Sequence, residues 1–375
     1  MNTTTSVINR RIRQDVQSMH AYAIQDSQGM VKLDAMENPY PLSADLQAAL
    51  GQRLGALALN RYPDGRVNDL RRALGDYVDL PAGYDVMLGN GSDELISLLA
   101  MACDRPVATG EARPAILAPV PGFVMYAMSA ALQGLDFIGV PLTPEFALDV
   151  PAMVQAIETH QPAIVYLAYP NNPTANLWNR GDMAQIIAAA ERVGSIVAVD
   201  EAYQPFSSHS WIDEIRARPQ NHGHVLLMRT LSKFGLAGVR LGYMVGPAAL
   251  VAEVDKLRPP YNVSVLNYEC ALFALEHQDV FAAQALEIRA QRAMLLEAFG
   301  ALPGVRAFDS DANMVLVRFE GAVGRAQQVF DGLKARGILV KNVSKMHPLL
   351  ANCLRLTVGT AEENRALLAA LQDLT

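Results

Sequence analysis

The chain has 375 residues, more than the ~250–300 at which a single hydrophobic core stops growing, so we expect two domains. Hydrophobic residues make up 51% of the chain and charged residues 18%, a balance that excludes an intrinsically disordered protein. The formal net charge of −7 indicates no basic face for a nucleic acid or an anionic membrane, and we expect neither partner.

The cysteines and the N-terminus bear on the compartment. Cys103, Cys270 and Cys353 are an odd number without CxxC spacing, so we expect neither a disulfide framework nor a metal site. The apolar runs stay short of the ~18 residues needed to cross a bilayer, and the first residues lack the apolar stretch of a secretory signal. We therefore expect a cytoplasmic, globular protein.

Strands and helices alternate through the first two thirds of the chain. Residues 86–88 predict a strand that leads through a glycine-rich turn into a helix at 95–101. Residues 182–193 have helical periodicity. The pattern indicates βαβ units and a largely parallel sheet. Continuous apolar runs predict strands buried on both faces of that sheet, at residues 115–120, 164–168, 196–200 and 225–229.

The pair Pro259-Pro260 is the strongest break in the second half of the chain. After it, the sequence predicts a helical region and three strands, at residues 266–300, 314–319, 338–341 and 354–358. We therefore predict an α/β protein in three parts. These are an N-terminal arm that packs with the small domain (1–39), a large domain with a mostly parallel sheet flanked by helices (40–260), and a small α+β domain (261–375).

Polar residues follow three successive strands of the predicted sheet. Asn172 comes after the strand at 164–168, Asp200 ends the next strand with Tyr203 after it, and Lys233 follows the third strand. In open α/β sheets, ligands bind beyond the carboxyl ends of the strands. We therefore expect these side chains to form one site.

Pyridoxal 5′-phosphate needs this set of groups. It requires a lysine for a Schiff base, a carboxylate at its pyridine nitrogen and hydrogen-bonding groups at its phenolic oxygen. Lys233 is the candidate for the Schiff base and Asp200 for the pyridine nitrogen. We expect Asn172 and Tyr203 to hydrogen-bond the phenolic oxygen.

The phosphate of this cofactor requires an anion site. We expect the backbone N–H groups of Gly91, Ser92 and Asp93 to bind it where a helix begins, because the helix dipole favours an anion there. Side chains that follow the lysine strand could complete the site: Thr230, Ser232 and Arg240.

Each of these residues alone also has an ordinary structural explanation. Asp200 could be a turn residue, Lys233 a solvated surface lysine and Ser92 a helix cap. The order and spacing of the whole set favour the cofactor.

Segments around these residues resemble a known enzyme family. YPNNPT (169–174), VDEAY (199–203) and TLSKFGLAGVRLGY (230–243) are similar to those of the class I/II aminotransferases, the fold type I pyridoxal-phosphate enzymes. Further segments resemble the histidinol-phosphate aminotransferases: DAMENPYP (34–41), NRYP (60–63), GNGSDE (89–94), PGFVMY (121–126) and CLRLTVG (353–359). The resemblance extends over about residues 20–365 and implies the fold type I architecture.

The resemblance implies roles for further residues. Phe123 would stack on the cofactor ring, and Arg355 would bind the substrate carboxylate with both arms of its guanidinium. Tyr62 would reach the cofactor phosphate in the partner subunit, which implies a homodimer with shared active sites. Tyr22 and Asn38 would lie near the substrate.

The chain departs from the family pattern at three places. Lys233 and Arg240 are seven positions apart, whereas most aminotransferases have eight. Ala175 stands where the family usually has glycine, and Lys341-Asn342 stands where it usually has Arg-Asp. In the family that arginine binds the substrate phosphate, so Lys341 is the candidate for this role here. A lysine keeps the charge but loses the bidentate fork.

The resemblance implies an aminotransferase that moves the amino group of histidinol phosphate to a 2-oxo acid such as 2-oxoglutarate, in histidine biosynthesis. Lys233 would be the base that moves the substrate proton. A lyase similar to threonine-phosphate decarboxylase and an aromatic amino acid aminotransferase remain alternatives. A non-catalytic cofactor-binding regulator is a remote one, because the chain has no appended basic segment and keeps the lysine, aspartate, asparagine and tyrosine.

Overall fold

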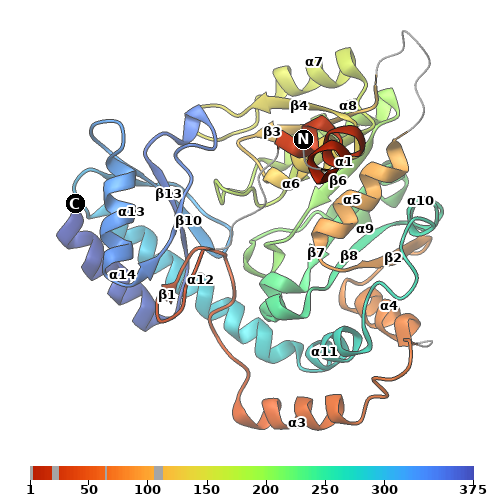
Figure 1. Ribbon diagram of the computed structural model, residues 1–375, viewed down its shortest axis with the longest axis horizontal. Coiled ribbons are helices and arrows are strands. Elements are labelled where there is room, and N and C mark those ends of the chain that lie inside the picture. Colours follow the sequence, from red (N-terminus) through yellow and green to blue (C-terminus); the bar gives the residue numbers. More distant parts are fainter. Residues whose placement is uncertain (1–2, 19–24, 64–65, 105–112) are drawn as a thin grey trace.

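The computed structural model describes residues 3–18, 25–63, 66–104 and 113–375 (Figure 1). The strands of its larger sheet are β2 (Tyr84–Gly89), β3 (Ala115–Val120), β4 (Asp136–Pro141), β5 (Ile164–Ala168), β6 (Ile196–Asp200), β7 (Val225–Thr230) and β8 (Gly242–Pro247). Their order is β2-β8-β7-β6-β5-β3-β4. The antiparallel pairings, β2 with β8 and β7 with β8, both involve β8, and the other pairings are parallel, so the predicted, mostly parallel sheet is confirmed.

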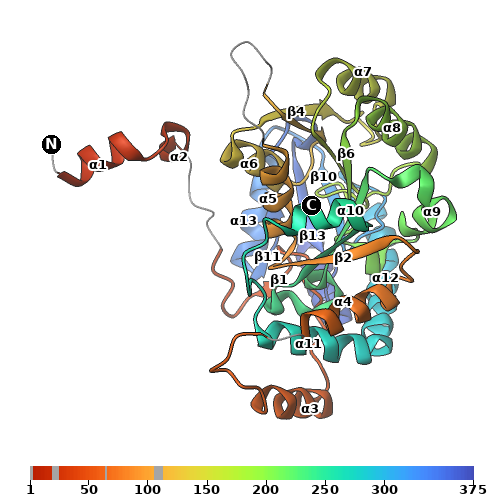
Figure 2. The same cartoon turned by 90° about the vertical axis from the view of Figure 1, so that its right-hand side faces the viewer.

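Helices cover both faces of this sheet (Figure 2). They are α4 (Arg66–Tyr77), α5 (Ser92–Cys103), α6 (Val124–Gln133), α7 (Val150–His160), α8 (Arg180–Val193), α9 (Ile212–Ala217), α10 (Ala248–Asp255) and α11 (Val265–Glu276). Tyr166 and Ala198 pack on one face with α5, α6 and α10, whereas Val165 and Val197 pack on the other with α4, α7, α8, α9 and α11. Central strands therefore need apolar residues at every position, which explains the continuous apolar runs.

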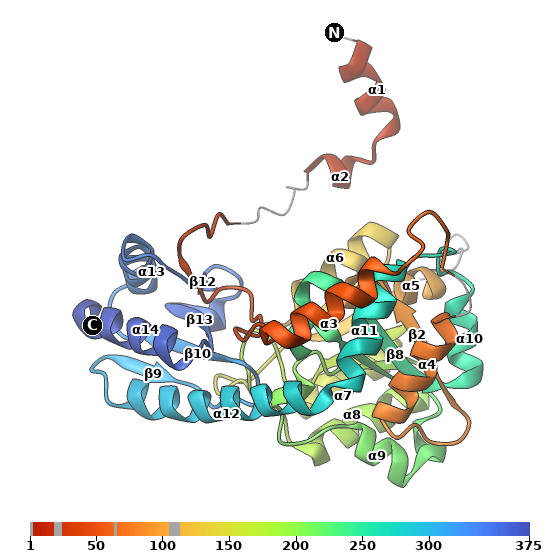
Figure 3. The same cartoon turned by 90° about the horizontal axis from the view of Figure 1, so that it is seen from below.

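A second, antiparallel sheet lies beside the larger one. Its strands are β9 (Val305–Ala307), β10 (Met314–Phe319), β12 (Lys341–Asn342) and β13 (Cys353–Thr357), in the order β12-β13-β10-β9. Three helices pack against it: α12 (Gln278–Gly300), α13 (Arg325–Ala335) and α14 (Ala361–Leu374). Figure 3 shows α12 running from the larger-sheet part to this one. Phe281 of α12 belongs to the core of the larger sheet, and Leu295 belongs to that of the smaller sheet.

The N-terminal segment reaches the smaller sheet. Helices α1 (Thr3–Arg11) and α2 (Gln14–Ser18) project from the body of the molecule (Figure 3). Farther along, β1 (Val31–Lys32) pairs in parallel with β11 (Ile338–Leu339), and the backbone N–H of Leu33 donates to the Leu339 carbonyl over 2.7 Å. Leu33 is buried in the core of the smaller sheet. The division at residues 39 and 260 stays a prediction.

Some elements differ from the sequence prediction. Strands β4 and β8 were not predicted, because β4 lies at the sheet edge with a single buried residue and β8 is rich in glycine. The helical region at 266–300 is two helices, α11 and α12, and the strand at 338–341 is divided into β11 and β12. Among the helices of the described residues, none is long and apolar enough to cross a membrane.

Candidate active site

The polar residues at the strand ends meet in a cavity of about 350 Å³. Its walls come from the segments after β5, β6 and β7, from the starts of α5 and α6, and from the arm at residues 35–37. This is the carboxyl edge of the larger sheet, where ligands bind in open α/β folds. Most predicted site residues line it: Ser92, Asp93, Phe123, Asn172, Asp200, Tyr203, Thr230, Ser232, Lys233 and Arg240.

Asp200 is a buried carboxylate at the end of β6. Its Oδ2 accepts a hydrogen bond from the Tyr126 hydroxyl over 2.7 Å, and its Oδ1 accepts one from the Ala202 backbone N–H over 3.1 Å. Burial raises the pKa of Asp200 to about 6, and these two hydrogen bonds oppose the rise. Each oxygen accepts one hydrogen bond from the protein and can accept another from a ligand in the cavity.

Lys233 follows β7, and its Nζ donates a hydrogen bond to the Ala35 carbonyl of the arm over 2.9 Å. Burial and, less strongly, the nearby positive charge of Arg355 lower the pKa of Lys233 to about 8. Arg240 acts in the same direction with a smaller effect. A lysine with this pKa is neutral often enough near pH 7 to act as a nucleophile or a base.

The start of α5 forms a cradle suited to an anion. Gly91 is the N-cap of this helix, with φ of +80°, and the first backbone N–H groups of a helix have no partner within it. Strand β8 comes close to this point because Gly242 lacks a side chain, since a Cβ there would lie 2.7 Å from the Ser92 nitrogen. A Cβ on Gly91 would lie 2.7 Å from Nη2 of Arg240. Both glycines thus keep open the space in which an anion could meet N–H groups and a guanidinium.

The side chains around Arg240 are linked by hydrogen bonds. Its Nη1 donates to the Ser232 hydroxyl over 3.3 Å, and its Nη2 lies 3.5 Å from Oδ2 of Asp93. The hydroxyl oxygens of Thr230 and Ser232 lie 3.0 Å apart. This places the predicted anion-binding side chains together.

Arg355 is not among the residues that line the cavity, but it links the smaller sheet to the cavity wall. It lies on β13, and its Nη1 donates to Oδ1 of Asn172 over 2.7 Å. Its Nη2 donates to the Asp34 carbonyl over 2.8 Å. Tyr203 is the residue expected to act together with Asn172 at the phenolic oxygen of the cofactor. Burial raises the pKa of Tyr203, so its phenol stays a neutral donor. Arg355 thus contacts a residue of the cavity wall and the arm at once.

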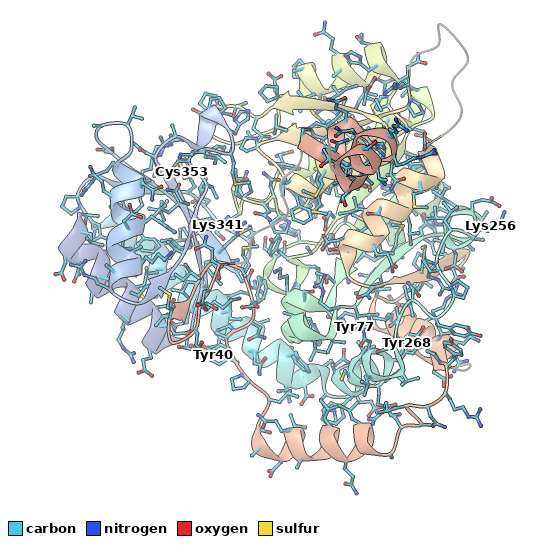
Figure 4. The ribbon with its side chains drawn as sticks, in the orientation of Figure 1. Tyr40, Tyr77, Lys256, Tyr268, Lys341 and Cys353 are labelled. Atoms are coloured by element: carbon cyan, nitrogen blue, oxygen red, sulfur yellow. The ribbon has the colours of Figure 1, made fainter. Side chains whose placement is uncertain are left out.

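Lys341 lies directly opposite Arg355 in the pairing of β12 with β13. Residues opposite each other in an antiparallel pair share one face of the sheet. Figure 4 shows Lys341 in the smaller-sheet part of the molecule. Its side chain therefore lies on the same face as Arg355, which contacts Asn172 of the cavity wall.

The remaining predicted residues lie elsewhere. Asn38 donates to the Phe234 carbonyl and, over 2.8 Å, to Gln284, so its amide holds the chain next to the lysine. Tyr62 is 76% exposed and stacks on Tyr261, with ring centroids 4.5 Å apart. Among the described residues, the cavity lining does not include Tyr62. Tyr22 lies outside the described residues.

Several contributors to the site were not predicted from the sequence, among them Tyr126 and the Ala35 carbonyl. The hydroxyl of Tyr126 contacts Asp200, and a signal was present, because Tyr126 follows Phe123 by one helical turn. The Ala35 carbonyl contacts Lys233, and no side-chain pattern could have indicated a backbone oxygen. Within the part of the chain that the structure describes, no cluster of His, Cys, Asp or Glu could hold a metal ion.

We expect Lys233 to be acylated by acetic anhydride with a midpoint near pH 8, because only the neutral amine reacts and burial lowers its pKa to about 8. The protein is first treated with hydroxylamine, which releases carbonyl compounds from lysines. Peptide mass spectrometry measures the acylated fraction of Lys233 across the pH series, with the exposed Lys256 as the reference for the amount of reagent. A Lys233 midpoint above about pH 10, as for an ordinary lysine, would contradict the lowered pKa.

The chain matches known aminotransferases over almost its full length. Residues 28–371 match the model of the aminotransferase class I and II family. The chain is 67% identical to histidinol-phosphate aminotransferase of Polaromonas naphthalenivorans (99% of this chain, 98% of the relative), and 63% identical to that of Paracidovorax citrulli (99% of each).

A solved structure shares the fold. Histidinol-phosphate aminotransferase of Sinorhizobium meliloti in complex with pyridoxal-5′-phosphate superposes with a TM-score of 0.82 at 23% identity, over 97% of each chain. This likeness confirms the predicted fold type I architecture. The family match and the sequence identities lead to one conclusion: the chain belongs to the class I and II aminotransferases.

Proposed function

We propose that this chain is a pyridoxal-5′-phosphate-dependent aminotransferase that moves the amino group of histidinol phosphate to a 2-oxo acid such as 2-oxoglutarate, a reaction of histidine biosynthesis. The observation that carries the proposal is one cavity that contains the Lys233 amine, the buried Asp200 carboxylate and the cradle at the start of α5. The names of the relatives support the choice of substrate.

The residues present fit pyridoxal phosphate. Asp200 would accept a hydrogen bond from the pyridine N–H, and Lys233 would bind the aldehyde carbon. The phosphate would occupy the cradle of Gly91, Ser92 and Asp93. Phe123 would stack on the ring of the cofactor, and Asn172 and Tyr203 would hydrogen-bond its phenolic oxygen. The phosphate would also be bound by three side chains: Thr230, Ser232 and Arg240. When bound, this cofactor supplies an electron sink for negative charge at the substrate Cα.

The residues of the chain would then hold and move protons. Lys233 Nζ would take the proton from the substrate Cα, and a pKa near 8 suits a base that must both accept and return a proton near neutral pH. Asp200, kept ionised, would hold the proton on the ring nitrogen. The arm residues Ala35, Met36 and Glu37 line the same cavity and would limit the access of water.

The two substrates would depend on different side chains. A 2-oxo acid has a carboxylate next to the reacting carbon, and the buried Arg355 would bind it. Histidinol phosphate has a hydroxymethyl phosphate instead of that carboxylate, so its binding needs a second cation. Lys341, opposite Arg355 in the sheet, supports this proposal.

A comparison of amino donors tests the proposed function. The full-length protein with pyridoxal phosphate is mixed in turn with histidinol phosphate, phenylalanine, tyrosine and threonine phosphate, and the spectral change of the first half-reaction is followed. We expect the fastest change with histidinol phosphate and glutamate formation when 2-oxoglutarate is added. Carbon dioxide release from threonine phosphate would favour the lyase, and preference for phenylalanine or tyrosine an aromatic aminotransferase. No reaction with any donor would favour a regulator.

Lys341→Ala should slow the use of histidinol phosphate by roughly ten- to a hundredfold, because a charge-assisted hydrogen bond to a phosphate is worth ~1.5–3 kcal/mol. The 2-oxoglutarate half-reaction should change little, because Arg355 would bind that substrate. Single-turnover kinetics of both half-reactions measure the difference, with the exposed Lys345→Ala as a control. Equal losses in both half-reactions, or none, would remove Lys341 from the phosphate site.

We also propose a homodimer with shared active sites, in the cytoplasm. An exposed aromatic pair, Tyr62 and Tyr261, lies apart from the cavity wall of its own chain and is available to a partner. Free thiols at Cys103, Cys270 and Cys353 are compatible with a reducing compartment.

Mixed dimers test the shared sites. Lys233→Ala and Tyr62→Phe subunits are each expected to be strongly impaired. A mixed dimer has one site with both changes and one with neither, so activity should return after subunit exchange. Native mass spectrometry verifies that exchange has occurred. Verified mixed dimers without recovered activity would contradict a role for Tyr62 in the partner's site.

A further inference from the structure

Tyr126 has no assigned role, yet it is among the most constrained side chains of the site. It is 2% exposed and lies on α6, one helical turn after Phe123. Its ring stacks on Tyr166 with centroids 4.2 Å apart and meets Phe123 edge to face at 5.6 Å. Two aromatic neighbours therefore fix the ring, and the ring fixes the position of its hydroxyl.

The fixed hydroxyl contacts one atom that matters for chemistry. It donates to Oδ2 of Asp200 over 2.7 Å, and the backbone N–H of Ala202 holds Oδ1 from the other side. A carboxylate held at both oxygens cannot rotate about its Cβ–Cγ bond without losing a buried hydrogen bond. The remaining acceptor positions of Asp200 are thereby kept in one orientation.

Resting on the proposed function, we propose that Tyr126 is a positioning residue that acts through Asp200. Its hydroxyl keeps this carboxylate ionised and oriented so that the carboxylate can hold the proton on the ring nitrogen of pyridoxal phosphate. Tyr126 itself touches neither the substrate nor the reacting atoms in this proposal.

The charges around Asp200 explain why such a donor is needed. Burial raises the pKa of Asp200, and the negative charges of Asp93 on α5 and of Glu201 raise it further. Tyr166 on β5 and Tyr203 after β6 are phenols whose own pKa burial raises, so they stay neutral and add no charge near Asp200. The hydrogen bonds from Tyr126 and Ala202 oppose these effects.

The side chain of Tyr126 can play this part over a wide pH range. Burial raises its pKa well above that of an ordinary tyrosine, so it stays a neutral donor. With this donor the pKa of Asp200 is about 6, which leaves the carboxylate ionised at pH 7. Without it, the pKa of Asp200 should move into the working range near neutrality.

Tyr166 offers a matched control. It is fully buried, belongs to the same stacked pair, and its hydroxyl makes no hydrogen bond among the described residues. Tyr166→Phe and Tyr126→Phe therefore each remove one phenolic hydroxyl from the same stacked pair of rings. Only the second change removes a contact with Asp200.

The test measures pyridoxal phosphate binding to the full-length chain between pH 5.5 and 9, together with the visible absorption of the bound cofactor. We expect Tyr126→Phe to weaken binding by about ten- to a hundredfold near pH 6–7. The loss should shrink toward pH 9, where Asp200 ionises without help. Tyr166→Phe should match the unmodified protein at every pH. If both variants had the same dependence of binding on pH and the unmodified protein bound normally, the role of Tyr126 would be overturned but the proposed function would not. Failure of the unmodified protein to bind pyridoxal phosphate would overturn the proposed function.

A double-mutant cycle with Asp200→Asn checks that Tyr126 acts through the carboxylate. In the Asp200→Asn background, Tyr126→Phe should change cofactor affinity less than twofold and should not alter its pH profile. The melting temperature of each variant without cofactor shows whether it folds. The effect of Tyr126→Phe is measured within each background, once with Asp200 and once with Asp200→Asn. A further loss of tenfold or more in that background would show that Tyr126 acts independently of Asp200, and would overturn the inference.

Discussion

One guanidinium group connects the parts of the molecule that form the candidate site. Arg355 on the smaller sheet donates to Asn172 beyond β5 and to the Asp34 carbonyl in the arm. Its side chain is buried and has little contact with water. These oxygen atoms therefore accept hydrogen bonds that water would accept from an exposed guanidinium. The smaller sheet, the arm and the larger sheet are thereby held at one point. A substrate carboxylate that binds there would meet a cation whose position is already set by three separate segments.

Among the described residues, Asp200 and Lys233 of the cavity have no close partner of opposite charge, whereas a neighbouring buried carboxylate has one. Burial disfavours the ionised forms of both Asp200 and Lys233, which moves their pKa values toward each other, to about 6 and about 8. By contrast, the buried Glu201 is paired with Arg229 over 2.9 Å, and its carboxylate accepts the hydrogen bond of the Ser210 hydroxyl. A paired, hydrogen-bonded charge has a structural role, whereas a perturbed one in a cavity is typical of a reactive site. The sheet edge thus contains both kinds of group a few residues apart.

The sequence predicted the strands and the strand-end residues well for a physical reason. Parallel strands buried on both faces need unbroken apolar runs, and their carboxyl ends meet at one edge, so order in the chain becomes proximity in space. Contacts made by backbone atoms were not predictable. Lys233 donates to the carbonyl of Ala35, and every residue has such a carbonyl, so the sequence cannot indicate this contact. Ala175 adopts φ of +65°, a region that favours glycine, which gives a physical reason for the glycine usual in the family. The roles of the site residues, the shared sites and the domain division stay predictions.

The pairing of β1 with β11 has a consequence for biosynthesis. Val31 and Ile338 are neighbours in the fold although about 300 residues separate them in the chain. A ribosome that adds ~5–20 residues per second makes β1 at least roughly 15 s before its partner strand exists. During that interval the strands of the smaller sheet, in whose core Leu33 is buried, have not been made. The larger sheet can form while the chain is still being made, but the arm, and with it the carbonyl that contacts Lys233, can take its place only when synthesis is almost complete.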